Sequence, residues 1–191
     1  MKRILYILYA LFFIGCSETN SAQTKKDLSM RYFESVNFKN LSDGYLVKSV
    51  EIDQQNINID LNFENNKPTD NQLNSLDLFL NQLSKIIKIN ETKIRSEFVS
   101  SVDNVVNEYI SYHLSEIPKD ELHQLIDYNN KSKSDRLKLF EKIKLTRVGI
   151  YPQDNERYAI FDYTIGEKYT QYLIVITTDK NGKIIDVTTE S

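Results

Sequence analysis

The segment Tyr169–Thr177 (Tyr-Thr-Gln-Tyr-Leu-Ile-Val-Ile-Thr) decides the fold class, because its second half is an unbroken run of apolar, mostly β-branched residues. Such a run predicts a central β-strand with both faces covered. The next residues, Asp179-Lys180-Asn181-Gly182, predict a hairpin turn, since Asn-Gly tolerates positive φ angles. We therefore expect Ile184–Thr189 to return as an antiparallel partner strand.

Two further strands are predicted ahead of this hairpin. Thr146–Tyr151 is a short β-rich run that ends at Pro152. Tyr158–Ile165 is a second run, and it ends at a Gly-Glu turn. The C-terminal third of the chain should therefore contain four consecutive strands.

An N-terminal pair of strands is predicted by a different signal. Tyr45–Ile52 is rich in β-branched and aromatic residues. In Ile57–Phe63, apolar residues alternate with polar ones, and this period of two is typical of a half-buried strand. The short segment Asp53–Asn56 would join the two strands as a hairpin.

Between the two groups of strands, apolar residues recur at the spacing of three and four that is typical of helices. Thr69 and Gln72 precede the first helix at capping-box spacing, Pro118 suits the first turn of a third helix, and a fourth should begin near Ser134-Asp135. The apolar positions are Leu73, Leu76, Leu80, Leu83 and Ile87 for the first helix and Ile94, Phe98, Val102, Val105 and Tyr109 for the second. This order predicts an α+β fold, with an antiparallel sheet, made of the N-terminal hairpin and the C-terminal strands, covered by about four central helices.

Composition excludes several classes of protein. The 191 residues, 40% hydrophobic and 27% charged, are typical of one ordinary globular domain. The formal net charge of −3 argues against a nucleic-acid partner, which usually requires a basic face. Because Cys16 is the only cysteine, an internal disulfide and a cysteine-based zinc site are excluded.

The N-terminus has the features of a secretory signal. Lys2 and Arg3 supply positive charge, and Ile4–Ile14 is an apolar run too short for a transmembrane helix, which needs about 20 residues. The segment Phe13-Ile14-Gly15-Cys16 resembles the lipobox of bacterial lipoproteins, although Phe13 stands where Leu is usual. The resemblance implies that Cys16 is lipidated, with acyl chains such as palmitate as the membrane partner. A core helix with a stray cysteine and a cleaved, non-lipidated secretory protein are the alternatives.

These features predict three regions: a lipoprotein signal peptide at 1–15, the lipidated Cys16 with a flexible polar tether at 16–27, and a single α+β domain at 28–191. The protein would be anchored in the bacterial cell envelope. Ser17 favours the outer membrane over the inner, because the Asp that retains many proteobacterial lipoproteins in the inner membrane is absent at that position.

The C-terminal third is similar to the bacterial domain-of-unknown-function family numbered two thousand and four. The similarity consists of a Phe-Asp-Tyr strand, an apolar strand, a glycine hairpin and a closing Glu-Ser, which are here Phe161-Asp162-Tyr163, Leu173-Ile174-Val175, Asp179–Gly182 and Glu190-Ser191. Gln171 departs from the family pattern, which often has Asp before Tyr172. The resemblance covers about 45–191 and implies an α+β fold without established activity or catalytic residues. It also implies an immunity-like role, in which the protein neutralises a toxin.

Four residues are candidates for binding a protein partner: Tyr151, Asp162, Tyr163 and Tyr172. Asp162 is the most unusual acid, because its strand neighbours are apolar; an outward position in an alternating strand is the plain alternative. Tyrosine is enriched in this chain, with 12 residues, and its polar tip suits interfaces. In a chain without tryptophan, tyrosine can equally be the large core residue.

No catalytic residue, metal ligand or cofactor is predicted. The chain has no Gly-x-Ser-x-Gly nucleophile elbow, and neither His113 nor His123 has a triad partner that the sequence identifies. His123 and Asp127 share a helix face, but no zinc motif includes them. The preferred hypothesis is a non-enzymatic, membrane-anchored protein-binding lipoprotein. The alternative is a lipid-anchored hydrolase or metal-dependent enzyme of the envelope, which would need a pocket holding His113 or His123 beside a carboxylate.

Overall fold

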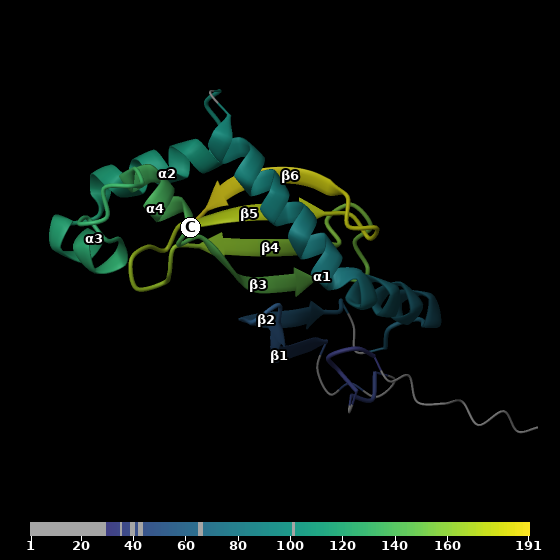
Figure 1. The fold of residues 1–191 in the computed structure, drawn as a ribbon. Helices are drawn as coiled ribbons and strands as arrows, with labels where there is room; N and C mark the ends of the chain where they lie inside the picture. Colours follow the sequence, from purple (N-terminus) through teal and green to yellow (C-terminus); the bar gives the residue numbers. More distant parts are fainter. Residues whose placement is uncertain (1–29, 35, 39–40, 42–43, 65–66, 101) are drawn as a thin grey trace, which may run out of the picture.

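A computed structural model describes residues 30–34, 36–38, 41, 44–64, 67–100 and 102–191. It has one layer of sheet and one layer of helices (Figure 1). The elements in chain order are β1 (Tyr45–Ile52), β2 (Gln55–Asn62), α1 (Asp70–Val99), α2 (Val105–Glu116), α3 (Lys119–Leu125), α4 (Asp135–Phe140), β3 (Lys144–Ile150), β4 (Ala159–Thr164), β5 (Leu173–Thr178) and β6 (Ile184–Glu190). The α+β fold with an N-terminal hairpin, central helices and C-terminal strands is confirmed.

The six strands form one sheet in sequence order, β1 to β6, and neighbouring strands are antiparallel except β2 and β3, which are parallel. A fully antiparallel sheet was expected. The parallel pair arises because the four helices connect β2 to β3, and a long crossover returns the chain to the end of the sheet from which β2 started. The helical middle of the sequence thus sets the relative direction of β2 and β3.

The β1–β2 hairpin is fixed to α1 through its turn. Asp53 and Gln54 both have positive φ angles, 48° and 66°, as a two-residue hairpin turn requires. The Asp53 carboxylate accepts a hydrogen bond from Ser84 at 2.9 Å and forms an ion pair with Lys88 at 3.3 Å, both on α1. These contacts hold the N-terminal hairpin against the longest helix.

Helix α1 begins at the expected capping box and is longer than the sequence pattern suggested. The Thr69 side chain accepts a hydrogen bond from the Gln72 backbone, and the Gln72 side chain accepts one from the Thr69 backbone. Ile94 and Phe98 were assigned to a second helix, but they belong to α1, which continues to Val99. The assignment was wrong because their apolar spacing continues the face of α1 without a phase break.

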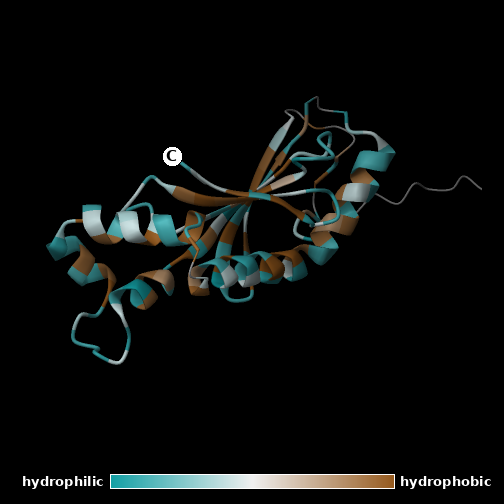
Figure 2. Cartoon of the chain, turned by 90° about the horizontal axis from the view of Figure 1, so that it is seen from above, coloured by the Kyte–Doolittle hydropathy of each residue, from teal (hydrophilic) through white to brown (hydrophobic). Residues whose placement is uncertain are grey.

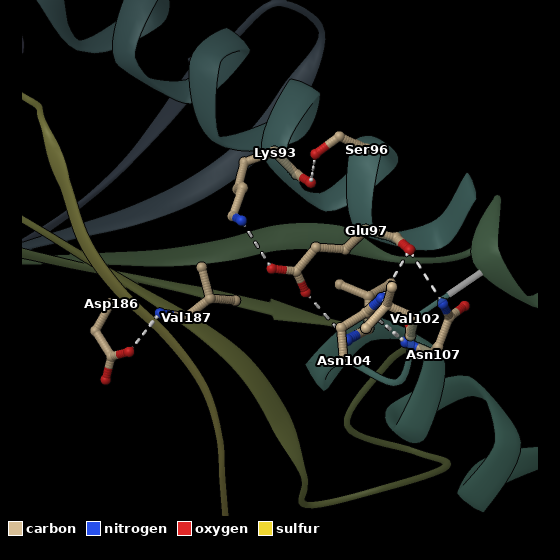
Figure 3. Close-up of polar contacts among 9 residues, drawn as sticks. Lys93, Ser96, Glu97, Val102, Asn104, Asn107, Asp186 and Val187 are labelled. Atoms are coloured by element: carbon tan, nitrogen blue, oxygen red, sulfur yellow. Dashed lines mark hydrogen bonds and ion pairs between the residues drawn. The ribbon is translucent and has the colours of Figure 1, made fainter. Parts of the chain in front are cut away.

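The break between α1 and α2 is made by asparagines (Figure 3). The Asn104 side chain caps α2 by accepting a hydrogen bond from the Asn107 backbone at 3.0 Å. The side-chain amides of Asn104 and Asn107 both donate to the Glu97 carbonyl, each at 3.0 Å, in the last turn of α1. Lys93 forms an ion pair with Glu97 at 3.0 Å. This junction lets the chain change direction while the terminal carbonyl of α1 stays hydrogen-bonded.

The hydrophobic core lies between the helices and one face of the sheet (Figure 2). It extends to the segment before β1, in which Met30, Phe33 and Phe38 are buried and Phe38 packs edge-on against Phe63 at 6.3 Å. In Figure 2 the helices lie along one side of the sheet, so the other face is free of described helices. We call this second face the open face, because no described helix packs on it, although some of its side chains, such as Val175 and Thr177, are buried.

Candidate functional site

The open face of the sheet is lined by two rows of side chains that run across the strands. The pairing of the strands places these residues side by side, because directly opposed residues point to the same face. One row is Ser49, Asn58, Arg147, Asp162, Val175 and Thr188, and the next is Val47, Asp60, Gly149, Ile160, Thr177 and Asp186. The centre of this open face therefore combines one cation with two flanking carboxylates.

Arg147 on β3 binds Asp60 on β2 and Asp162 on β4 at the same time. Its Nε and one terminal nitrogen donate to the two Asp60 oxygens at 2.9 and 2.7 Å, which is a bidentate arrangement. Its other terminal nitrogen donates to Asp162 Oδ2 at 2.8 Å. The Tyr151 hydroxyl lies 3.5 Å from the guanidinium. We call Asp60, Arg147, Tyr151 and Asp162 the arginine cluster.

Gly149 makes room for this cluster. A Cβ atom at position 149 would lie 2.8 Å from a terminal nitrogen of Arg147 and 3.3 Å from the Tyr151 ring. Any other residue would therefore crowd the guanidinium nitrogen that donates to Asp60. The glycine interrupts the row of side chains so that Arg147 can lie flat across the neighbouring strand.

The arginine cluster is a buried charge network with one accessible member. The Asp60 and Asp162 side chains are 3% and 8% exposed, whereas the Arg147 side chain is 37% exposed. Burial alone would lower the pKa of Arg147, but the hydrogen bonds that it donates to Asp60 and Asp162 raise it above its ordinary value. Replacing such a network by apolar residues is often neutral or stabilising, so its presence is weak evidence for a role in stability.

Exposed apolar side chains border the cluster on the edge strand. Tyr45 and Val47 on β1 are each 54% exposed, and Val47 lies directly opposite Asp60. Aromatic residues and arginine are enriched in protein interfaces, and aliphatic area around a charged centre supplies the hydrophobic part of binding. The open face can thus provide apolar contact beside the partly exposed guanidinium of Arg147.

The structure separates the four predicted binding residues into three places. Tyr151 and Asp162 meet at Arg147 on the open face. Tyr163 follows Asp162 in β4 and therefore points to the opposite, helix-covered face, where it is 2% exposed. Tyr172 lies at the end of the sheet beside α2. A single site made of all four residues is excluded by this geometry.

Tyr172 belongs to an aromatic cluster around His113. The Tyr172 ring packs edge-on against Tyr112 at 5.2 Å, and its carbonyl accepts a hydrogen bond from the Tyr109 hydroxyl at 3.2 Å. His113 Nδ1 lies 2.7 Å from the Tyr109 carbonyl, so Nδ1 donates and Nε2 accepts from the Thr170 hydroxyl at 2.8 Å. Burial lowers the pKa of His113. This arrangement fixes the 165–172 loop to α2.

The enzyme alternative needed a pocket with a histidine beside a carboxylate. A pocket of about 260 Å³ includes His113 and Glu108, but both ring nitrogens of His113 are hydrogen-bonded to Tyr109 and Thr170. His123 stacks on Tyr128 at 4.3 Å. Within the described part of the chain, neither histidine forms an ion pair with a carboxylate, and no group of three or more His, Cys, Asp or Glu side chains could hold a metal ion.

Cys16 and the predicted signal peptide and tether lie outside the described residues. Among the helices that are described, none is both long enough and apolar enough to span a bilayer. The lipid anchor therefore stays a prediction from the sequence.

Comparison with known proteins adds no relative. No family model, curated protein or solved structure matches the chain. The similarity of the C-terminal strands to the family of unknown function stays a prediction. The candidate site consequently rests on the geometry of the open face alone.

Sequence reasoning missed Arg147 and Asp60, which form the closest ion pair of the arginine cluster. They are 87 residues apart, and only the parallel pairing of β2 with β3 brings them together. A usable signal was present, because Arg147 is the one charged residue in Thr146–Tyr151 and is followed two residues later by Gly149. A lone charged residue two positions from a glycine in an otherwise apolar strand indicates a charge that another side chain must neutralise.

Proposed function

We propose that this protein is a membrane-anchored bacterial lipoprotein whose α+β domain binds a protein partner through the open face of its sheet. The anchor is the acyl chain on Cys16, and the polar residues 17–27 would act as a tether that separates the domain from the bilayer. The domain acts by binding and does not carry out a reaction. The bacterial envelope, with the outer membrane favoured, is the proposed location.

The observation that supports binding most strongly is the partly exposed Arg147 within an otherwise buried network. Two buried carboxylates hold its guanidinium at the centre of the open face, and its exposed part can donate a hydrogen bond to a carbonyl group of a partner. Fixing the side chain in advance lowers the entropy cost of binding. Tyr45 and Val47 supply apolar area beside it. The preferred partner is therefore a protein with a carbonyl-rich segment flanked by apolar residues.

Affinity capture tests this proposal with two matched variants. Full-length chain in mild detergent would be used to capture partners from membranes of the bacterium that produces it. Val47→Glu places a charge on the open face, and Leu78→Glu places one on α1, where Leu78 is also exposed. We expect one specific partner with the wild type and Leu78→Glu, and loss of that partner with Val47→Glu. Equal recovery with both variants, or no specific partner, would contradict the proposal.

The anchor is tested independently. Metabolic labelling with a palmitate analogue should mark the wild-type chain and leave Cys16→Ala unlabelled, because the thiol is the lipid acceptor. Equal labelling of both proteins would refute lipidation at Cys16. Either result leaves the capture experiment interpretable, since the open face lies on the folded domain.

A further inference from the structure

The two edges of the sheet, formed by β1 and β6, differ in how they are protected (Figure 1). At the β6 edge the pairing with β5 skips Ile185, which makes a bulge, and the Asp186 carboxylate accepts a hydrogen bond from the Val187 backbone N–H at 2.9 Å. Native proteins use such interruptions to keep an edge strand from pairing with another chain. The β1 edge has no interruption, because all eight of its residues pair with β2 in one continuous register.

Half of the backbone groups of β1 point away from β2. Ile52 and Gln55 close a two-residue turn and are therefore a hydrogen-bonded pair. In an antiparallel ladder such pairs alternate with pairs whose N–H and C=O groups point outward. The Gly44 carbonyl accepts a hydrogen bond from the Phe63 N–H at 2.6 Å, which fits the same alternation. The outward-pointing residues are therefore Tyr45, Val47, Ser49 and Glu51.

The described part of the chain leaves this outward edge unused. Among the described residues, no backbone hydrogen bond joins β1 to any element other than β2. All four outward-pointing residues are exposed, Tyr45 and Val47 by 54% each. The segment before β1 contacts the strand at Lys48, whose side chain pairs with Glu34 at 3.7 Å on the helix-covered side. The outward N–H and C=O groups can therefore form a ladder with a further strand.

We propose that this strand is β1 of a second copy of the chain, paired antiparallel across a two-fold axis so that the two sheets become one. A two-fold interface requires a surface that complements itself. With the axis at Lys48, Tyr45 lies opposite Glu51 of the second copy, and Val47 lies opposite Ser49. In this register every outward-pointing residue meets another one, so all the outward N–H and C=O groups of both strands are hydrogen-bonded.

The side chains fit the same register. Directly opposed side chains of an antiparallel pair interact, and they lie on the same face of the sheet. The Tyr45 hydroxyl can donate to the opposing Glu51 carboxylate, which forms no ion pair within the described residues. On the other face the two Lys48 side chains meet at the axis, and the Glu34 carboxylate already paired with each of them offsets their like charges.

A dimer through β1 also accounts for the difference between the two edges. The joined sheet would end in β6 on both sides, and its bulge and the Asp186 contact would stop further pairing. The inference does not rest on the proposed protein partner, because it concerns the backbone of the β1 edge and is measured on the chain alone. A single-chain protein would leave the open-face proposal standing, and a failure to capture a partner would leave the dimer standing.

Sedimentation equilibrium of the full-length chain in density-matched detergent tests the dimer. We expect the mass of two chains for the wild type. Val47→Lys combined with Ser49→Lys places lysine opposite lysine on both sides of the axis and should weaken association by about tenfold or more. Ile185→Lys combined with Thr189→Lys makes the same change at exposed positions of β6 and should keep the wild-type mass. A single-chain mass for the wild type, or equal weakening by both double variants, would overturn the proposal.

A charge-complementary variant tests the register. Val47→Lys combined with Ser49→Glu places lysine opposite glutamate in the proposed pairing and should restore the mass of two chains. Restoration would also show that substitutions at these two positions are compatible with folding. A variant that folds, as its circular dichroism would show, but has the mass of one chain would contradict the register.

Residue-resolved hydrogen exchange on the chain alone tests whether the β1 backbone is used. In the wild type the amides of Val47 and Ser49 should exchange at least about tenfold more slowly than in the variant with lysine at both positions, since only the dimer hydrogen-bonds them. Equally fast exchange in both proteins would overturn the proposal. Slow exchange in a protein with the mass of one chain would show that another segment of the same chain covers β1, and would overturn it as well.

Discussion

The two faces of the sheet are built on different principles. The helix-covered face is lined by residues such as Ile59, Val148 and Phe161, which are fully buried. The open face carries Asp60, Arg147 and Asp162 at the neighbouring positions of the same three strands. Alternation along each strand thus separates a packing surface from a charged one. One face of the sheet thus packs against the helices, and the charged face is the one to which we assign the proposed recognition.

The largest expected effect is on the covered face. Leu80 on α1 is fully buried in the core, so Leu80→Ala removes apolar contacts and leaves a cavity. The free energy of unfolding should fall by about 4 kcal/mol. Urea denaturation would measure it. A loss below about 1 kcal/mol is typical of surface positions and would contradict the assignment of the helix-covered face as the stabilising core.

A slightly smaller loss is expected when the arginine cluster is opened. Arg147→Met leaves two buried carboxylates without a cation and should cost about 3 kcal/mol, the lower end of the range for buried pairs because the guanidinium is partly exposed. Denaturation would be compared with Leu80→Ala.

Replacing the whole cluster sharpens the comparison. The triple variant Asp60→Leu, Arg147→Met, Asp162→Leu carries no uncompensated charge and should unfold at nearly the wild-type urea concentration. It should nevertheless lose the captured partner. If the triple variant were as unstable as Arg147→Met alone, the cluster would be a stabilising element and the functional interpretation of the open face would be wrong.

Lowering the pH should lower the free energy of unfolding, because His113 is buried. Burial lowers the pKa of His113 below its ordinary value of 6.5, so the unfolded chain takes up the proton more readily than the folded one. The contribution of neutral His113 to the free energy of unfolding is therefore fully present above pH 6.5 and is lost as the pH is lowered below it. Thermal unfolding between pH 8 and pH 5 would show this loss, and His113→Gln should remove it while His123→Gln keeps it. An unchanged pH profile for His113→Gln would contradict the buried, neutral histidine.

The smallest effect on stability is expected at the exposed edge of the open face. Val47→Glu and Leu78→Glu each alter an exposed side chain and should change the free energy of unfolding by no more than about 0.5 kcal/mol. Only Val47→Glu should reduce partner capture. A large destabilisation by Val47→Glu would show that β1 packs more tightly than its exposure indicates.

The sequence pattern predicted the covered face better than the open one. The spacing of Leu73, Leu76 and Leu80 identified the start of α1, since local periodicity reports which face is buried. The end of α1 was missed because Ile94 and Phe98 continue the same face, and the actual stop depends on the side-chain cap at Asn104. Local periodicity predicts that a helix exists, but it does not show where the helix ends when the apolar pattern continues past a single capping residue.

The candidate site was only half predictable for a different reason. Asp162 stood out as an acid among apolar neighbours, and the structure gives it a buried ion pair on the open face. Its partner Arg147 lies opposite it on the neighbouring strand β3 and was overlooked despite its local signal, whereas Asp60 joins the cluster only through the parallel pairing of β2 with β3. Tyr163 was grouped with Asp162, although one step along a strand places it on the other face. Contacts between distant strands depend on topology, which local patterns do not contain.

The proposal that recognition takes place on the open face is tested most directly by site-specific photocrosslinking in the cells that produce the protein. A photoreactive residue would replace Val47 on the open face in one strain and Leu78 on α1 in another, since both positions are exposed. Apart from a second copy of the chain, the account predicts one discrete crosslinked protein from position 47 and none from position 78. The same adduct from both positions, or an adduct from position 78 alone, would contradict it.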